Sequence, residues 1–204
     1  MGNFPTIIID FETTGLSPNM GDRTIEVGAV LVKENRIVDR FQSLMNPGFK
    51  ISSFIENYTG ITNQMLYKAP PITEAMRDLA KFLQNHYLVA HNASFDSKFL
   101  TAEFQRIGHE HKNEFACTML SSRRLYQDAP NHKLETLVRF KKLKTDGVHH
   151  RALADAEMTA HLWLRLISDI KKAYGVKHVP FDLMQRLGKV PKKNIGEFFM
   201  KATF

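Results

Sequence analysis

The sequence is poor in cysteine and has no long apolar segment. Cys117 is the only cysteine in the 204 residues, which excludes an intramolecular disulfide and is typical of proteins from reducing compartments. No apolar run approaches the length that spans a membrane, and the first residues form neither the basic region nor the apolar core of a secretion signal. We therefore expect a cytoplasmic protein without a membrane partner.

Acidic residues are outnumbered by basic ones. The chain has 28 Lys and Arg against 21 Asp and Glu, a formal net charge of +7. This excess favours a polyanionic partner, with nucleic acid ahead of an anionic membrane surface. The length and a hydrophobic content of 43% fit one globular domain.

The apolar pattern predicts a three-stranded meander followed by alternating helices and strands. Strands are expected from Thr6 through Glu12 and at 24–32, 37–45, 87–91 and 115–117. Helices are expected at 52–58, 62–66, 72–85, 94–108, 118–126, 133–140 and 151–173. This order predicts a mixed, three-layer α/β fold for residues 1–174. Residues 175–204 are expected to form a basic, helical tail that packs on the domain, docks a partner or follows nucleic acid.

Two acidic residues end the first strand. Side chains alternate along a strand, so Asp10 and Glu12 project from the same face. Like charges this close repel each other, and a divalent metal between them relieves the repulsion. The alternative is that the chain simply enters a solvated turn.

Three further residues could belong to the same site. Asp96 follows the 87–91 strand, and ligands of open α/β sheets gather at the carboxyl ends of strands. Asp155 lies early in the last long helix. Both acids also suit the dipole of a helix N-terminus, where Ser94 could be a cap. His150 can share a site with Asp155 only from the loop before the helix, and a solvated loop histidine is the alternative.

Three segments together resemble the ordered motifs of the DEDDh exonuclease family, and in particular the proofreading (epsilon) subunits of bacterial DNA polymerase III. The segments are Asp10-Phe11-Glu12-Thr13-Thr14-Gly15-Leu16, His91-Asn92-Ala93-Ser94-Phe95-Asp96 and His150-Arg151-Ala152-Leu153-Ala154-Asp155-Ala156. The resemblance covers about residues 5–170. It implies the ribonuclease-H-like fold, with a sheet of about five strands in the order 3-2-1-4-5 and strand 2 antiparallel.

The resemblance also implies roles for single residues. Asp10, Glu12, Asp96 and Asp155 would bind two Mg²⁺ or Mn²⁺ ions, and His150 would be the general base. His149 is the chemical alternative, but the family's histidine precedes the last aspartate by five positions, which favours His150. Contacts to the 3′ end of the substrate are expected from a larger set: Phe11, Thr13, Thr14, Gly15, Leu16, Tyr58, His91, Asn92 and Phe95.

The resulting hypothesis is a two-metal 3′-to-5′ exonuclease that releases nucleoside 5′-monophosphates from single-stranded or frayed DNA ends, in replication proofreading or repair. Basic residues near Arg123, Arg124 and 139–144 could steer phosphates or could be solvated helix faces. One alternative is an exoribonuclease similar to RNase T or oligoribonuclease. Another is a non-catalytic nucleic-acid-binding module. A polymerase subunit is the expected protein partner, through residues 175–204.

Overall fold

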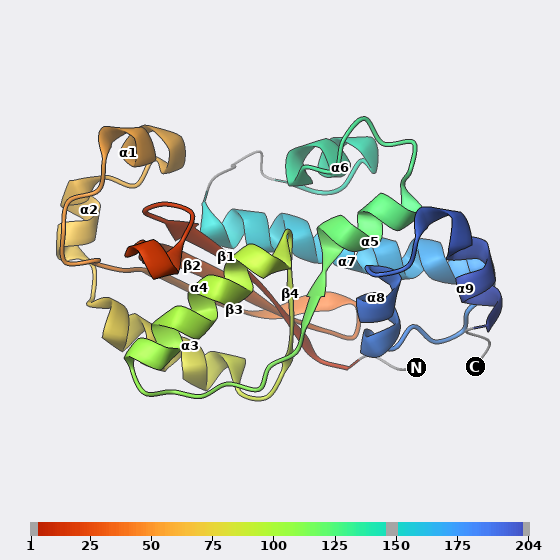
Figure 1. Ribbon diagram of the computed structural model, residues 1–204, viewed down its shortest axis with the longest axis horizontal. Coiled ribbons are helices and arrows are strands. Elements are labelled where there is room, and N and C mark those ends of the chain that lie inside the picture. The colour runs from red at the N-terminus through yellow and green to blue at the C-terminus, as the bar shows by residue number, and fades with distance from the viewer. Residues whose placement is uncertain (1–3, 146–150, 202–204) are drawn as a thin grey trace.

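A single five-stranded sheet forms the centre of the computed structural model, which describes residues 4–145 and 151–201 (Figure 1). The strands are β1 (Thr6–Thr13), β2 (Thr24–Lys33), β3 (Arg36–Leu44), β4 (Tyr87–Ala90) and β5 (Phe115–Cys117). The α-helices are α1 (Ser53–Thr59), α2 (Asn63–Lys68), α3 (Ile72–Leu83), α4 (Ala93–Arg106), α5 (Thr118–Leu125), α6 (Leu134–Phe140), α7 (Ala152–Tyr174), α8 (Phe181–Leu187) and α9 (Ile195–Lys201). Short 3-10 turns are η1 (Pro18–Met20) and η2 (Lys192–Asn194). Among residues 4–145 and 151–201, none of the helices combines the length and the apolar character that a membrane-spanning segment requires.

The strand order is β3-β2-β1-β4-β5, as the family resemblance implies. Strand β2 runs antiparallel to both β1 and β3, whereas β4 is parallel to β1 and β5 is parallel to β4. The carboxyl ends of β1 and β4 therefore meet at one edge of the sheet, where ligand sites of α/β folds occur.

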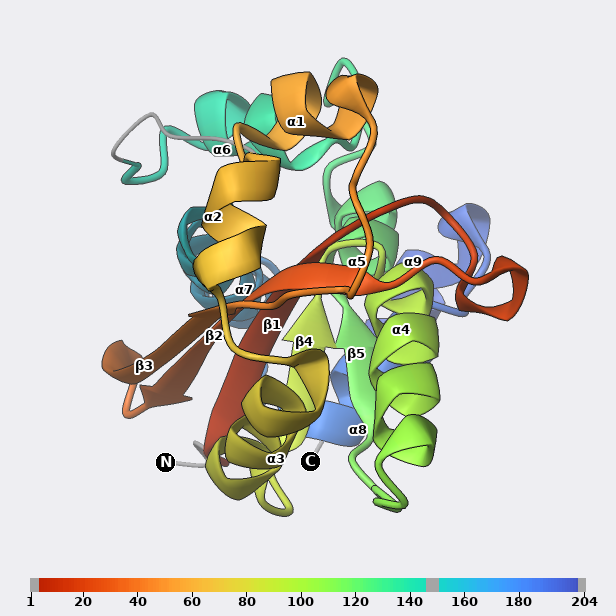
Figure 2. The ribbon, with the colours of Figure 1, turned by 90° about the vertical axis from the view of Figure 1, so that its left-hand side faces the viewer.

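Helices cover both faces of the sheet (Figures 1 and 2). Ile8 of β1 packs in a core with Ala156 and Trp163 of α7. Its neighbours Ile7 and Ile9 point the other way, into a core built with α3 and α4. Because both faces of β1 are buried, this strand is apolar on consecutive positions until Asp10.

Local sequence signals explain several boundaries. Glu34 and Asn35, with φ of 53° and 61°, make the two-residue turn between β2 and β3. Ser52 caps α1 by accepting a hydrogen bond from the Ile55 N–H. The expectation that Ser94 caps the next helix is wrong, because Asn92 takes a left-handed conformation (φ 75°) and α4 begins at Ala93.

The C-terminal helices pack on the α7 side of the sheet. Their buried apolar residues are Phe181, Leu183, Met184, Leu187, Ile195 and Phe199. The rings of Tyr174 and Phe199 stack with centroids 4.0 Å apart. Arg124 of α5 donates a hydrogen bond from Nε to the Val190 carbonyl oxygen at 3.0 Å. Residues 181–199 thus share one apolar core with the sheet.

Candidate active site

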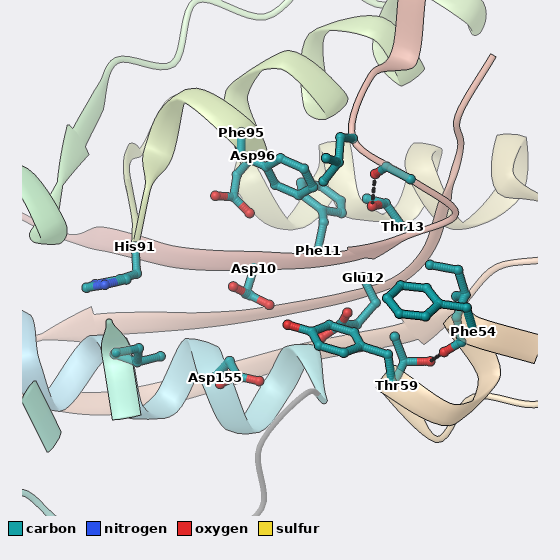
Figure 3. A pocket seen from close by; sticks show the side chains of 15 residues that line it. Asp10, Phe11, Glu12, Thr13, Phe54, Thr59, His91, Phe95, Asp96 and Asp155 are labelled. Carbon is teal, nitrogen blue, oxygen red and sulfur yellow. Dashed lines mark hydrogen bonds between the residues drawn. The ribbon is translucent and has the colours of Figure 1, made fainter. Parts of the chain in front are cut away.

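A cleft of about 580 Å³ lies at the carboxyl ends of β1 and β4 (Figure 3). Its acidic residues come from three elements: Asp10 and Glu12 from β1, Asp96 from α4 and Asp155 from α7. The other lining residues are Phe11, Thr13, Gly15, Leu16, Phe54, Ile55, Tyr58, Thr59, His91, Phe95 and Leu134. Segments far apart in the sequence therefore build a single site.

Strand alternation directs the first two acids. Asp10 and Glu12 share the α7 face with Ile8, whereas Phe11 points into the opposite core. On the α7 side they meet Asp155, and carboxylate oxygens of the three residues lie within 4.8 Å of one another. Hard oxygen ligands at this separation suit a divalent cation such as Mg²⁺ or Mn²⁺.

Gly28 allows α7 to come this close. Gly28 pairs with Asp10 in the β1–β2 register. A Cβ atom at Gly28 would lie 2.1 Å from the Leu153 nitrogen and 2.2 Å from the Ala152 carbonyl carbon. The first turn of α7 therefore rests directly on the backbone of β2, and Asp155 lies beside Asp10.

Asp96 approaches from the other side of Asp10 (Figure 3). It lies in the first turn of α4 and is only 2% exposed. Burial raises the pKa of Asp96 to about 7, although hydrogen bonds from its own main-chain N–H and that of Phe11 oppose the shift. After burial, the charge of Asp96 is the strongest of the effects that raise the pKa of Asp10.

The acidic cluster is electrostatically costly by itself. Burial, together with the charges of Asp155, Glu26 and Asp96, raises the pKa of Glu12 to about 8. Burial and the charges of Asp96 and Asp155 likewise hold the pKa of Asp10 well above its usual value. A carboxylate cluster that resists ionisation alone is stabilised in its charged form by bound cations. The donor set therefore fits divalent metal binding.

Exposed apolar side chains surround the mouth of the cleft. Leu16 is 78% exposed, Phe54 is 71% exposed and Tyr58 is 53% exposed. The rings of Phe54 and Tyr58 stack with centroids 6.1 Å apart on one side of α1. Phe95 lines the cleft from α4 and packs on Phe99 at 4.9 Å. The site therefore offers flat apolar surfaces next to acidic oxygens.

His91 lines the cleft, yet both of its ring nitrogens have protein partners. Nδ1 is 2.9 Å from the Thr118 hydroxyl, and Nε2 is 2.9 Å from the His132 carbonyl oxygen. Burial lowers the pKa of His91 to about 4. A neutral ring that donates from Nε2 and accepts at Nδ1 satisfies both contacts. His91 thereby ties the end of β4 to Thr118, the first residue of α5, and to the segment before α6.

Two of the expected substrate residues have local structural contacts. Among the described residues, Thr14 and Asn92 are not part of the cleft lining. The Thr14 hydroxyl contacts Asp22 at 3.3 Å and accepts a hydrogen bond from the Arg23 N–H at 3.0 Å. Asn92 supplies the left-handed turn before α4. His150 lies outside the described residues.

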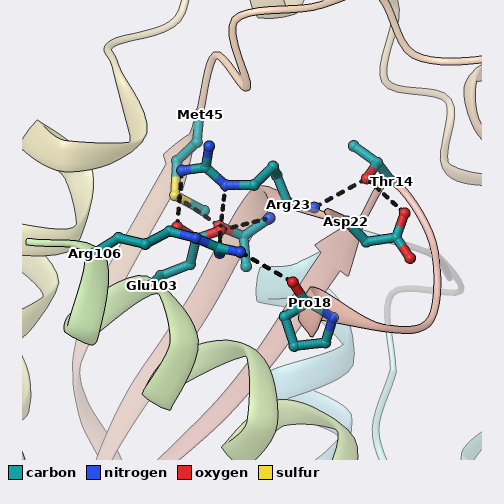
Figure 4. Close-up of polar contacts among 8 residues, drawn as sticks. Thr14, Pro18, Asp22, Arg23, Met45, Glu103 and Arg106 are labelled. Carbon is teal, nitrogen blue, oxygen red and sulfur yellow. Dashed lines mark hydrogen bonds and ion pairs between the residues drawn. The ribbon is translucent and has the colours of Figure 1, made fainter. Parts of the chain in front are cut away.

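A buried ion cluster holds the β1–β2 loop at the edge of the cleft (Figure 4). Glu103 of α4 is fully buried and accepts two hydrogen bonds of 2.9 Å from Arg23. Arg106 contacts Glu103 at 3.0 Å and donates to the Pro18 carbonyl oxygen, also at 3.0 Å. The loop that carries Gly15 and Leu16 is thus fastened to α4.

Four residues that line the cleft were not among those predicted from the sequence: Phe54, Ile55, Thr59 and Leu134. The spacing of Phe54 and Tyr58, four positions apart on a short helix, places both rings on one side and was an available signal. Leu134 carried no such signal, since only the packing of α6 against α7 brings it to the cleft.

Comparison with known proteins gives one consistent result. The exonuclease family model (RNase_T) matches residues 7–163. The chain is 41% identical over 173 residues to a PolC-type DNA polymerase III of Caldanaerobacter subterraneus subsp. tengcongensis, covering 85% of this chain and 12% of that protein. It is 39% identical over 165 residues to the Bacillus subtilis PolC-type DNA polymerase III, covering 80% of this chain and 11% of the relative. The chain thus spans about an eighth of the length of these relatives.

Solved structures agree with the sequence comparison. Exonuclease X in complex with 5′-overhanging duplex DNA superposes with a TM-score of 0.69 at 30% identity, covering 90% of this chain and 99% of that chain. The nuclease domain of 3′hExo, a DEDDh family member bound to rAMP, superposes with a TM-score of 0.71 at 22% identity, covering 82% of this chain and 93% of that one. The second likeness concerns the fold alone.

Proposed function

The chain belongs to the exonuclease (RNase_T) family, and from this premise we propose that it is a 3′-to-5′ exonuclease of the DEDDh type. It would degrade single-stranded or frayed DNA ends with the help of two divalent cations. The products are nucleoside 5′-monophosphates. The observation that carries the proposal is the convergence of Asp10, Glu12 and Asp155 within 4.8 Å, with Asp96 in the same cleft.

The four acids would hold the cations, Mg²⁺ or Mn²⁺. When bound, such cations lower the pKa of a water and neutralise charge on the scissile phosphate. Asp10 would hold a cation together with Glu12 and Asp155, whose carboxylate oxygens lie within 4.8 Å of its own. His150 immediately precedes Arg151 and is proposed, from the sequence pattern, to take the proton of the attacking water.

The rim residues would bind the terminal nucleotide. Phe54, Tyr58 and Leu16 present exposed apolar surface above the acids, and stacking on such surfaces is tolerant of base identity. Stacking of the terminal base on these side chains would require its separation from the complementary strand. This favours unpaired or frayed ends over fully paired ones.

Two findings about similar proteins support DNA as the substrate. The relatives at 41% and 39% identity are DNA polymerases, and the structural neighbour at 30% identity is described in complex with DNA. A proofreading role, with a polymerase as the partner, is part of the same proposal. Within the tail, described residues 175–201 could contact such a partner through their outer surface, where Met200 is 72% exposed, because their inner side chains pack in the core.

The test is digestion of matched 5′-labelled DNA and RNA oligonucleotides with Mg²⁺, Mn²⁺ or EDTA. The wild type should shorten single-stranded DNA from its 3′ end only with a divalent cation. Asp155→Asn removes one charge at constant shape and should reduce the rate by at least about 100-fold. Asp78→Asn, an exposed acid on α3, is the matched control and should cleave normally. Cleavage in EDTA or full activity of Asp155→Asn would contradict the proposal, and preferential digestion of RNA would redirect it.

A further inference from the structure

The clearest organised contact next to the acidic cluster is an ion pair between Glu26 of β2 and Arg151 at the start of α7. Glu26 is fully buried, although it is a carboxylate. Arg151 approaches it with Nη2 at 2.9 Å and Nε at 3.2 Å. The two residues are 125 positions apart in the chain, so the contact exists only in the folded protein. A buried carboxylate needs such compensation, because an unpaired one is strongly unfavourable.

Glu26 also fixes the backbone of α7. Its Oε2 accepts a hydrogen bond of 3.1 Å from the Ala152 N–H, one of the free donors at the helix N-terminus. The Gln42 side-chain amide donates a further hydrogen bond of 2.8 Å to Glu26 Oε1. A carboxylate in this position is favoured by the helix dipole as well. Glu26 thus anchors the first turn of α7 to β2 through both a side chain and a main-chain group.

This anchor is connected to the active site on both sides. Glu26 pairs directly with Glu12 in the β1–β2 register. On the other side, the Arg151 N–H donates a hydrogen bond of 3.1 Å to Asp155 Oδ2. The Arg151 charge also lowers the pKa of Glu12, against the stronger effects that raise it. One pair of residues therefore contacts the segments that carry two of the proposed metal ligands.

We propose that Glu26 and Arg151 are positioning residues, which orient Asp155 over Asp10 and Glu12 and fix the point where the chain enters α7. The inference rests on the proposed function. Partners that orient metal ligands typically change metal affinity or activity by about 10–100-fold when removed. Neither side chain needs to touch the substrate to have this effect.

A direct role for Arg151 in substrate binding is the competing explanation. The Arg151 side chain is 36% exposed and lines a surface groove with Lys68, Gln42 and Ser43. An arginine in such a groove could contact a phosphate. The two explanations differ in what Glu26 does, since Glu26 is fully buried and cannot reach a substrate.

The experiment compares Glu26→Gln, Arg151→Met, Arg151→Lys and the double variant Glu26→Gln/Arg151→Met with the wild type. For each, kcat and KM are measured on a single-stranded DNA oligonucleotide, and Mn²⁺ binding is measured by electron paramagnetic resonance without DNA. Arg40→Met is the matched control, because Arg40 also bridges to α7, through Glu157, but farther along the helix.

Positioning predicts a specific pattern. Each single replacement by Gln or Met should lower kcat by about 10-fold or more and weaken Mn²⁺ binding, with KM within about twofold of the wild type. The double variant should be no worse than the poorer single one, because both remove the same interaction. Arg151→Lys keeps the charge without the two-pronged contact and should fall between the wild type and Arg151→Met. Arg40→Met should keep wild-type kcat.

Other results overturn the proposal. A raised KM in Arg151→Met with normal kcat in Glu26→Gln would make Arg151 a substrate ligand. Folded variants with normal kcat and Mn²⁺ binding would leave the pair without a functional role. Circular dichroism identifies variants that do not fold, and Arg151→Lys then decides the matter because it preserves the cation. If the wild type does not cleave DNA, the proposed function fails, whereas the Mn²⁺ measurements still test the positioning.

Discussion

Replacing Gly28 by alanine is expected to separate activity from stability. The new Cβ would lie 2.1 Å from the Leu153 nitrogen and 2.4 Å from the Ala152 carbonyl oxygen. Non-bonded atoms rest at about 3.5 Å, so the first turn of α7 must move by more than about 1 Å. Both contacts are to backbone, and no side-chain rotation can relieve them. Asp155 lies in this turn and moves with it.

The effect on catalysis should exceed the effect on folding. Overpacking of this kind costs about 1–3 kcal/mol, which lowers Tm by about 2–12 °C in a chain of this size. A displacement of about 1 Å at a reacting centre can cost about 100-fold in rate. We therefore expect a folded protein whose kcat is reduced by about 100-fold.

The assay measures kcat on single-stranded DNA at a temperature well below Tm, together with thermal unfolding by circular dichroism. Gly196→Ala in α9 is the matched control, because a Cβ there has no atom within 4 Å. It should keep full activity and be as stable as the wild type or slightly more stable. Wild-type kcat in a folded Gly28→Ala protein would refute the claim that close approach of α7 assembles the site.

Three further outcomes concern stability, pH and substrate binding. Glu103→Ala should lower the free energy of unfolding, measured in urea, by about 2–4 kcal/mol. This is the lower end of the range for a broken buried ion pair, because Arg23 and Arg106 are partly exposed. A loss below about 1 kcal/mol would show that the cluster does not hold the β1–β2 loop. In EDTA, Tm should fall as the pH rises from about 5 to about 8. The fold raises the pKa of Glu12 from 4.5 to about 8 and that of Asp96 from 3.8 to about 7. Both acids therefore keep protons in the folded state that the unfolded chain releases. Saturating Mg²⁺ should flatten this slope, and a Tm that rises with pH in EDTA would contradict the raised values. Phe54→Ala should leave Tm unchanged, since the ring is 71% exposed. It should raise KM for single-stranded DNA by about fivefold or more, because stacking contributes about 1–3 kcal/mol per base. An unchanged KM would show that Phe54 is not part of the binding surface.

Much of the fold follows from local pattern. The β-branched run before Asp10 predicts the central strand, and β1 begins at Thr6 as expected. The helical spacing after Pro71 predicts α3, although the helix ends at Leu83, two residues before the predicted end. The strand order 3-2-1-4-5 was implied by the family resemblance, because pairing between strands far apart in the chain is not encoded in either strand alone.

The sequence by itself determined which residues alternate and which acids stand at the ends of elements, because these depend on neighbours a few positions away. It placed Asp10 and Glu12 on one side of a strand through the two-residue period of an extended chain. Only the tertiary structure decided that Asp155 meets them. That meeting requires a helix to touch β2 at Gly28 and a buried carboxylate, Glu26, to bond an arginine 125 positions away. Such contacts arise from the packing of whole elements, which no short stretch of sequence specifies.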